Sequence, residues 1–182
     1  MRFLREAACV ANCANFCGSK YSIFCLMMRA STGALPSVLI DTTPDLRNQL
    51  LDTGTGRLDA VVYTHSHADH VHGIDDLRMI VFNTRQRLPV WADGDTQNAL
   101  LSRFGYAFAQ PEGSPYPPIL DLHTIAGDVT VDGAGGPITF TPFEVNHGSI
   151  DALGFRIAGL AYVPDVAEIP EAAWPLLQGL DI

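Results

Sequence analysis

The stretch His65-Ser66-His67-Ala68-Asp69-His70 holds three histidines and one aspartate within six residues. It follows directly on Leu58–Thr64, whose centre Ala60–Tyr63 is a continuous apolar and aromatic run. Such a run predicts a short strand buried on both faces. The alternative is a solvated loop that happens to be rich in histidine. The chain has only six histidines, and four of them lie within residues 65–72, so the pattern favours a metal site over such a loop.

The spacing within this stretch indicates how the side chains divide between metal ions. At the end of an extended strand, His65 and His67 project to the same side, so both imidazoles can reach one ion. The chain must turn next, which places Asp69 and His70 where they can face a second ion. Imidazole suits zinc, iron and nickel, and carboxylate adds a preference for manganese or magnesium. We therefore expect divalent ions, Zn²⁺ or Mn²⁺, with Fe as a further candidate.

The composition describes one acidic globular domain. The chain has 182 residues, of which 47% are hydrophobic and 17% charged, and its net charge is −9. An acidic surface repels phosphate backbones and disfavours nonspecific nucleic-acid binding, but a bound metal pair can still attract a small anionic substrate. No apolar run is long enough to cross a bilayer. Asn12 and Asn15 interrupt the apolar start, which makes a poor secretory signal and predicts a cytoplasmic protein.

Residues 1–35 differ from the rest of the chain and form an atypical N-terminal segment. They hold four basic residues against one acid and all four cysteines. Three of these cysteines fall at helical spacing, but the spacing fits no common zinc or iron–sulfur pattern, so we interpret them as small apolar residues. Strand-like alternation is confined to Tyr21–Met28. The segment is either a divergent first hairpin or a non-native start, and the folded domain is predicted over residues 36–182.

Beyond residue 35, strands and helices interleave and the polar residues of interest lie at strand ends, as in a layered α/β enzyme. The expected strands are Ser37–Ile40, Leu58–Thr64, Leu88–Ala92, Ile119–Ile125, Val129–Val131, Ile138–Val145, and a hairpin of Phe155–Ala158 and Gly159–Val163. The expected helical segments are one opening at Thr43-Pro44-Asp45, with Leu46, Leu50 and Leu51 as its buried face, then Gly73–Phe82, Asp93–Phe104 and Pro170–Leu177. Leu180–Ile182 resembles the start of another strand.

The pattern H-x-H-x-D-H followed by Gly73 resembles the signature of the metallo-β-lactamase fold. The continuation Gly73-Ile74-Asp75-Asp76-Leu77-Arg78 and the earlier Asp41–Arg47 are similar to the PhnP-like phosphodiesterase branch of that family. The resemblance extends from about Val38 to Ile182 and implies a four-layer αββα sandwich. It does not cover residues 1–35, where the family has an opening strand and a glycine-rich turn.

The resemblance also implies roles for individual residues. The first metal would be held by His65, His67 and His147, the second by Asp69 and His70, and Asp165 would bridge the two. His147 follows a strand and precedes Gly148, and Asp165 follows the strand Gly159–Val163, so both lie at strand ends as the histidine run does. The family supplies one more histidine to the second metal from a strand beyond Ile182. We therefore expect a domain that is incomplete at its C-terminal end, with a second site that is short of one ligand.

Four other polar residues near the run have two interpretations each. His72 either supports a ligand or faces substrate, or it is a surface residue. Asp75, Asp76 and Arg78 either orient a ligand histidine or form a salt bridge at the start of a helix. His123, well before His147 in the chain, is expected to be structural.

The expected reaction is hydrolysis by a hydroxide held between two metal ions, with Asp69 and Asp165 as the catalytic carboxylates. No G-x-S-x-G stretch offers a nucleophilic serine. The first hypothesis is a phosphodiesterase acting on a small, anionic phosphodiester, cyclic or linear. The second is a thioester, lactone or carboxylic-ester hydrolase of the same fold. The third is an inactive, truncated metal-binding protein. A nuclease is disfavoured because no basic arm is visible, and a homodimer is left open.

Overall fold

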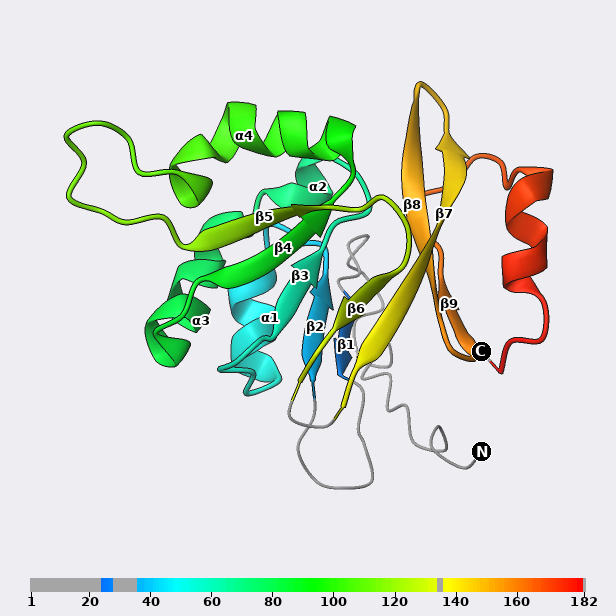
Figure 1. Ribbon diagram of the computed structural model, residues 1–182, viewed down its shortest axis with the longest axis horizontal. Coiled ribbons are helices and arrows are strands. Elements are labelled where there is room, and N and C mark those ends of the chain that lie inside the picture. Colours follow the sequence, from blue (N-terminus) through cyan, green and yellow to red (C-terminus); the bar gives the residue numbers. More distant parts are fainter. Residues whose placement is uncertain (1–23, 28–35, 134–135, 182) are drawn as a thin grey trace.

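The structure is a computed structural model that describes residues 24–27, 36–133 and 136–181. Two β-sheets lie against each other, and helices cover their outer faces (Figure 1). The first sheet has the order β1-β2-β3-β4-β5, in which β1 is antiparallel to β2 and the other neighbours are parallel. Its strands are β1 (Phe24–Met27), β2 (Ser37–Ile40), β3 (Ala60–Val62), β4 (Leu88–Ala92) and β5 (Leu120–Thr124).

The second sheet is antiparallel, with the order β6-β7-β8-β9. Its strands are β6 (Val129–Val131), β7 (Ile138–His147), β8 (Ile150–Ile157) and β9 (Leu160–Tyr162). The helical elements are α1 (Leu46–Asp52), α2 (Ala68–Val71), η2 (Ile74–Asp76), α3 (Leu77–Thr84), α4 (Gly94–Phe108) and η3 (Glu171–Leu177). None of the helices in the described part of the chain combines the length and the apolar character needed to span a membrane.

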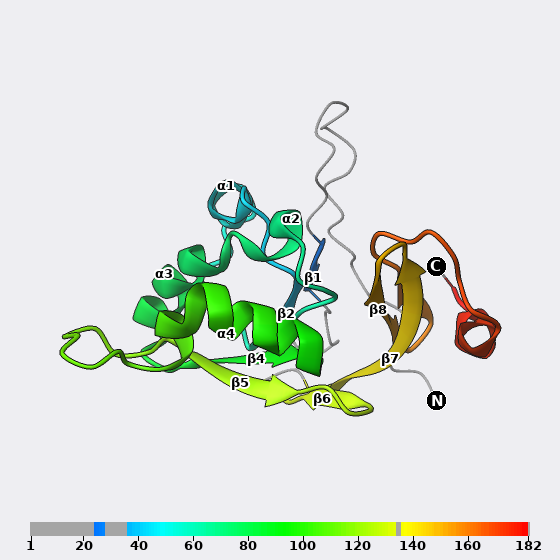
Figure 2. The same cartoon turned by 90° about the horizontal axis from the view of Figure 1, so that it is seen from above.

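Four layers result, and alternating strand residues fill the two spaces beside the first sheet. Leu39, Val61 and Val90 pack toward α1, α3 and α4, whereas Val38 and Val62 pack toward the second sheet. Both sets are fully buried, as a strand covered on both faces requires. On the far side of the second sheet, η3 forms the fourth layer (Figure 2). The predicted αββα sandwich is confirmed.

Most of the predicted elements are confirmed, and the differences have physical causes. Helix α1 begins at Leu46, not at Thr43, because the Thr43 carbonyl accepts the backbone N–H of Leu46 in a turn that precedes the helix. Leu51 is 69% exposed and therefore does not belong to the buried face. The predicted strand after Leu180 is absent from residues 180–181, the last described, although the Asp181 N–H donates to the Gly159 carbonyl.

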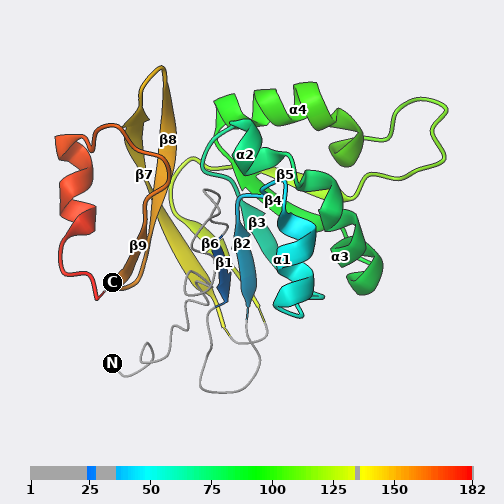
Figure 3. The same ribbon diagram turned by 180° about the vertical axis from the view of Figure 1, so that it is seen from behind.

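The N-terminal segment is described only at β1, which pairs antiparallel with β2 from Phe24 opposite Ile40 to Met27 opposite Ser37. This strand falls inside the predicted alternation of Tyr21–Met28. The remaining predictions for residues 1–35, including the clustered cysteines Cys9, Cys13 and Cys17, lie outside the described residues. Seen from behind, β1 and β2 lie between the helical layer and the second sheet (Figure 3).

Candidate metal centre

The histidine-rich stretch lies where both sheets meet. It leaves the carboxyl end of β3, and α2 begins directly after His67, whose backbone is still extended. The Thr64 carbonyl accepts a 2.9 Å hydrogen bond from the backbone N–H of Leu153 in β8. This bond ties the stretch to the second sheet, where β7 ends at His147. A two-residue turn follows His147, and Gly148 takes a φ of +80° that a residue with a side chain rarely adopts.

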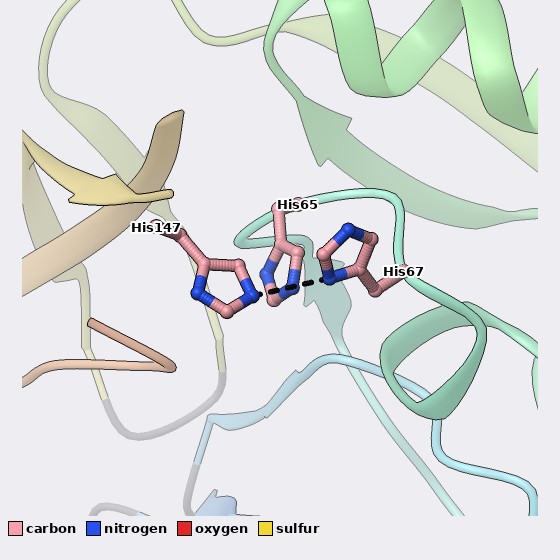
Figure 4. Close-up of side chains that lie close together, drawn as sticks. All are labelled: His65, His67 and His147. Atoms are coloured by element: carbon pink, nitrogen blue, oxygen red, sulfur yellow. Dashed lines mark hydrogen bonds between the residues drawn. The ribbon is translucent and has the colours of Figure 1, made fainter. Parts of the chain in front are cut away.

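Three imidazoles from these two sheets converge on one point and form the first cluster, His65, His67 and His147 (Figure 4). One nitrogen of each lies within 4.8 Å of the others. Nε2 of His147 is 3.1 Å from Nδ1 of His67. Two imidazole nitrogens at ~2.0–2.1 Å from one tetrahedral zinc ion would lie about 3.3 Å apart, close to this spacing.

A second cluster shares His65 with the first and adds His70 and Asp165. Nε2 of His70 lies 3.5 Å from Oδ2 of Asp165 and 3.8 Å from Oδ2 of Asp69. The same Asp165 oxygen is 3.9 Å from Nε2 of His147. An oxygen of Asp165 therefore lies within 4 Å of a histidine of each cluster, and its bridging role stays a prediction. Asp69 stands beside His70, at the edge of the second cluster.

One atom tests directly whether these residues suit a metal. Nε2 of His65 is buried and has no hydrogen-bond partner among the described residues, and burial of a nitrogen without a partner is costly. This nitrogen belongs to a residue that both clusters share. A divalent cation would satisfy it, and neutral imidazoles with carboxylates are a donor set that such ions accept. The residues therefore fit the group that the sequence implies.

Asp41, which the sequence analysis did not identify as a site residue, orients the histidines of the site. Its side chain is buried, and Oδ2 lies 2.7 Å from Nδ1 of His70. Oδ1 accepts the backbone N–H of Thr64 at 2.8 Å, and Oδ2 accepts the Thr64 hydroxyl at 2.8 Å. Asp41 follows β2, which lies next to β3 in a parallel sheet, so the sequence did carry a signal: a polar residue after the neighbouring strand.

These hydrogen bonds determine which ring nitrogens carry protons. An ionised Asp41 carboxylate can only accept, so Nδ1 of His70 donates to it, and a neutral His70 keeps a free lone pair on Nε2. The Thr64 hydroxyl also donates to Asp41, and its oxygen lies 2.9 Å from Nδ1 of His65. Nδ1 of His65 must then be the donor, which leaves Nε2 of His65 unprotonated. A single buried carboxylate thus turns a lone pair toward the cluster on both histidines.

The pKa shift of His65 agrees with this arrangement, whereas that of His70 shows that Asp41 also favours the charged form of its ring. Burial, with the neighbouring imidazoles His70, His67 and His147, lowers the pKa of His65 to about 3, so His65 is neutral at physiological pH. Burial alone would lower the pKa of His70, but the hydrogen bond and charge of Asp41, with Asp69 and Asp165, outweigh it and raise that pKa. Burial likewise raises the pKa of Asp41, against the hydrogen bonds from His70 and Thr64 that lower it.

Close packing fixes the loop that carries the ligands. The backbone N–H of Thr42 donates to the His70 carbonyl at 2.7 Å, and the N–H of Gly73 donates to the Thr42 carbonyl at 2.9 Å. A Cβ on Gly73 would collide with the Thr43 carbonyl, so glycine is required there by this close approach. From α4, the Arg103 guanidinium donates to the Ser66 carbonyl at 2.6 Å, between the two histidines of the run.

The remaining polar candidates lie outside both clusters. His72 is exposed, and its ring meets Phe104 edge-on at 5.8 Å. His123 stacks on Trp91 with ring centroids 4.7 Å apart. Arg78 pairs with Asp75 at 3.8 Å at the start of α3, which is the salt-bridge interpretation given for these two residues above.

Comparison with known proteins agrees with this architecture. A family model described as "Beta-lactamase superfamily domain" matches residues 37–182. The chain belongs to the metallo-β-lactamase superfamily. Among solved structures of this superfamily, a diphosphatase from the PhnP family aligns with a TM-score of 0.68 and 34% identity, over 84% of this chain and 59% of that one. The fold alone is shared with YhfI from Bacillus subtilis, at a TM-score of 0.54 and 19% identity over 79% of this chain and 52% of that one.

Among curated sequences, this chain is similar to an octanoyltransferase of Porphyromonas gingivalis (strain ATCC BAA-308 / W83), with 36% identity over 140 residues. The match covers 76% of this chain but only 27% of that relative. The chain thus spans about a quarter of the octanoyltransferase and about three fifths of the diphosphatase structure.

Proposed function

We propose that this chain is the metal-binding part of a hydrolase that cleaves a small phosphodiester, cyclic or linear. The observation that carries the proposal is the pair of clusters that share His65, with its unpartnered buried nitrogen, and have Asp165 between them. The 34% identity to a PhnP-family diphosphatase supports reaction at phosphorus over reaction at a carbonyl carbon. Zinc or manganese fits the mixed nitrogen and oxygen ligands.

The proposed ligands form two sets, one for each metal ion. His65, His67 and His147 would hold one ion, and His70 with Asp165 and Asp69 would hold the other. Bound ions of this kind lower the pKa of a water molecule and stabilise negative charge on substrate oxygens. Asp165 has a side chain that is 52% exposed, so its carboxylate can contact an incoming water and accept its proton. Asp41 holds the Nδ1 proton of His70, so Nε2 is the nitrogen that faces an ion, and Thr64 does the same for His65.

The experiment compares substrates on the protein loaded with Mn²⁺ or Zn²⁺. Bis-p-nitrophenyl phosphate tests the phosphodiester, p-nitrophenyl thioacetate tests the thioester, and a homoserine lactone tests the lactone. We expect turnover of the phosphodiester, and loss of that turnover and of the first-site metal in His67→Ala. His123→Ala is the matched control, because His123 lies on β5 outside both clusters, and it should retain metal and activity.

Three results would contradict the proposal in different ways. Clear thioester or lactone turnover without phosphodiester turnover would replace the substrate class and keep the metal centre. Stoichiometric metal binding with no turnover of any of the three substrates would favour a metal-binding chain without hydrolytic activity. Unchanged metal content in His67→Ala, measured by elemental analysis, would refute the ligand assignment itself.

A further inference from the structure

A cavity of about 580 Å³ opens on the helical side of the molecule. It is lined by α3, the end of α4 and the loop after α4, mainly through Arg78, Phe82, Tyr106, Tyr116 and Pro117. None of its lining residues belongs to either metal cluster. The loop after α4 lies at the far end of that helix from the β7–β8 hairpin (Figure 1). The volume of the cavity falls within the range of about 300–1,000 Å³ that small-molecule sites occupy.

Aromatic side chains that are exposed, and not packed in the protein core, form the walls of this cavity. Four aromatic side chains in the described residues are large and exposed, and three of them, Phe82, Tyr106 and Tyr116, line this one cavity. Their exposed fractions are 64%, 40% and 71%. Isolated exposed rings need no explanation, but a cluster around one hollow marks a surface that binds something apolar and flat.

The only charged side chain in the lining is Arg78. Its nearest acid, Asp75, is already engaged, because the Tyr106 hydroxyl donates to Oδ2 of Asp75 at 2.5 Å. Arg78 reaches Oδ1 of Asp75 only at 3.8 Å, beyond hydrogen-bonding distance. Its guanidinium therefore keeps its N–H groups available for a second anion. Burial and the bond to Asp75 raise the pKa of Tyr106 to about 12, so its ring brings no negative charge to the cavity.

The loop that closes the cavity has a defined shape. Nε2 of Gln110 donates to the Ser114 carbonyl at 2.6 Å, and the Ser114 hydroxyl accepts the backbone N–H of Tyr116 at 3.2 Å. Pro111 and Pro117 restrict the backbone on both sides of this turn. A preformed wall lowers the entropy that binding must overcome.

We propose that this cavity is a second ligand site, for a planar aromatic or heteroaromatic anion. The ring would lie against Phe82, Tyr106 and Tyr116, and a phosphate or carboxylate group would receive the guanidinium fork of Arg78. Asp75 and Arg78, which the metal centre does not use, thereby gain a role. The proposal is independent of the reaction at the metal clusters, since no residue is shared.

The test measures binding of AMP by calorimetry, with adenosine and ribose 5-phosphate as probes that lack either the anion or the aromatic ring. The background is His67→Ala kept metal-free with EDTA, so that neither cluster holds an ion that could capture phosphate. AMP should bind more tightly than either partial probe. Arg78→Met should weaken AMP binding about tenfold or more, the loss expected for a charge-assisted pair of hydrogen bonds. Phe82→Ala should weaken AMP and adenosine alike.

Matched controls come from the same helix. Arg85 directly follows α3, Met79 is 61% exposed on that helix, and neither lines the cavity. Arg85→Met and Met79→Ala should bind AMP as the background does. Absence of AMP binding in the His67→Ala background would overturn the proposal, because any binding to the wild type would then belong to the metal centre. Equal AMP affinity in Arg78→Met and Arg85→Met would overturn it as well.

Discussion

Replacing Asp41 with asparagine should weaken binding of the second metal ion while keeping the fold. Asparagine has nearly the same shape, and it tolerates the left-handed backbone that Asp41 adopts with a φ of +61°. Its carbonyl oxygen can still accept the Thr64 N–H, as Oδ1 does now at 2.8 Å. Its amide nitrogen then replaces Oδ2 and donates to Nδ1 of His70. In the wild type, Oδ2 of Asp41 instead accepts from this nitrogen at 2.7 Å. The proton of His70 must move to Nε2, which removes the lone pair that faces the second cluster.

The expected magnitude follows from these contacts. Loss of such an outer partner costs about 10–100-fold in metal affinity, or about 1.4–2.8 kcal/mol, and we expect the second metal equivalent to carry this loss. The first cluster should lose less, because His65 contacts Asp41 only through the Thr64 hydroxyl. Thr64→Val should reverse the order: it removes the partner of Nδ1 of His65 and leaves the pair of Asp41 and His70 in place.

The assay is competition against a chromogenic zinc chelator, which reports the two equivalents separately, with thermal unfolding of the metal-free protein alongside. Nitrogen-detected NMR of the histidine side chains would report the tautomer of His70 directly. Asp41→Asn binding both equivalents with wild-type affinity would refute the reasoning. So would a His70 ring that keeps its proton on Nδ1 in this variant.

Three further predictions concern the same site. Acidification should release the second metal equivalent before the first, because protons compete for Nε2 of His70 below its raised pKa, whereas His65 has a pKa of about 3. Dialysis from about pH 8 to about pH 5.5 with metal analysis tests this prediction. Simultaneous release of both equivalents would contradict it. In the metal-free protein the raised pKa of His70 contributes stability that is fully present below about pH 6.5 and is lost as the pH rises through the folded value, so His70→Gln should flatten that part of the stability profile in urea titrations. Gly73→Ala should lower the free energy of unfolding by about 1–3 kcal/mol because its Cβ meets the Thr43 carbonyl, while Gly94→Ala, with open space around it, should unfold like the wild type.

The local pattern predicted the elements well but not their pairing. Continuous apolar runs such as Ala60–Tyr63 predicted buried strands, and the acid at Asp93 predicted the start of α4, whose cap accepts the Thr96 N–H at 2.8 Å. The predicted beginning of α1 at Thr43 was wrong, because a tight turn at Thr43 competes with the helix for the same backbone groups. Strand order depends on contacts between distant residues, and periodicity carries no information about them.

By itself, the sequence determined that a metal-binding run follows a buried strand, because His65, His67, Asp69 and His70 are neighbours in the chain. His147 and Asp165 could be assigned only through resemblance to a family. Only the tertiary structure brings both residues to His65, because His147 ends β7 and Asp165 follows β9, two strands of the other sheet.

Only the structure revealed Asp41 and the aromatic cavity. Asp41 lies 29 positions before His70, and the two meet because β2 and β3 are adjacent parallel strands that end at one edge. Tyr106 on α4 and Asp75 on η2 are 31 positions apart and meet only in the folded chain. A residue that acts by orienting another needs its neighbour in space, and the fold supplies that neighbour.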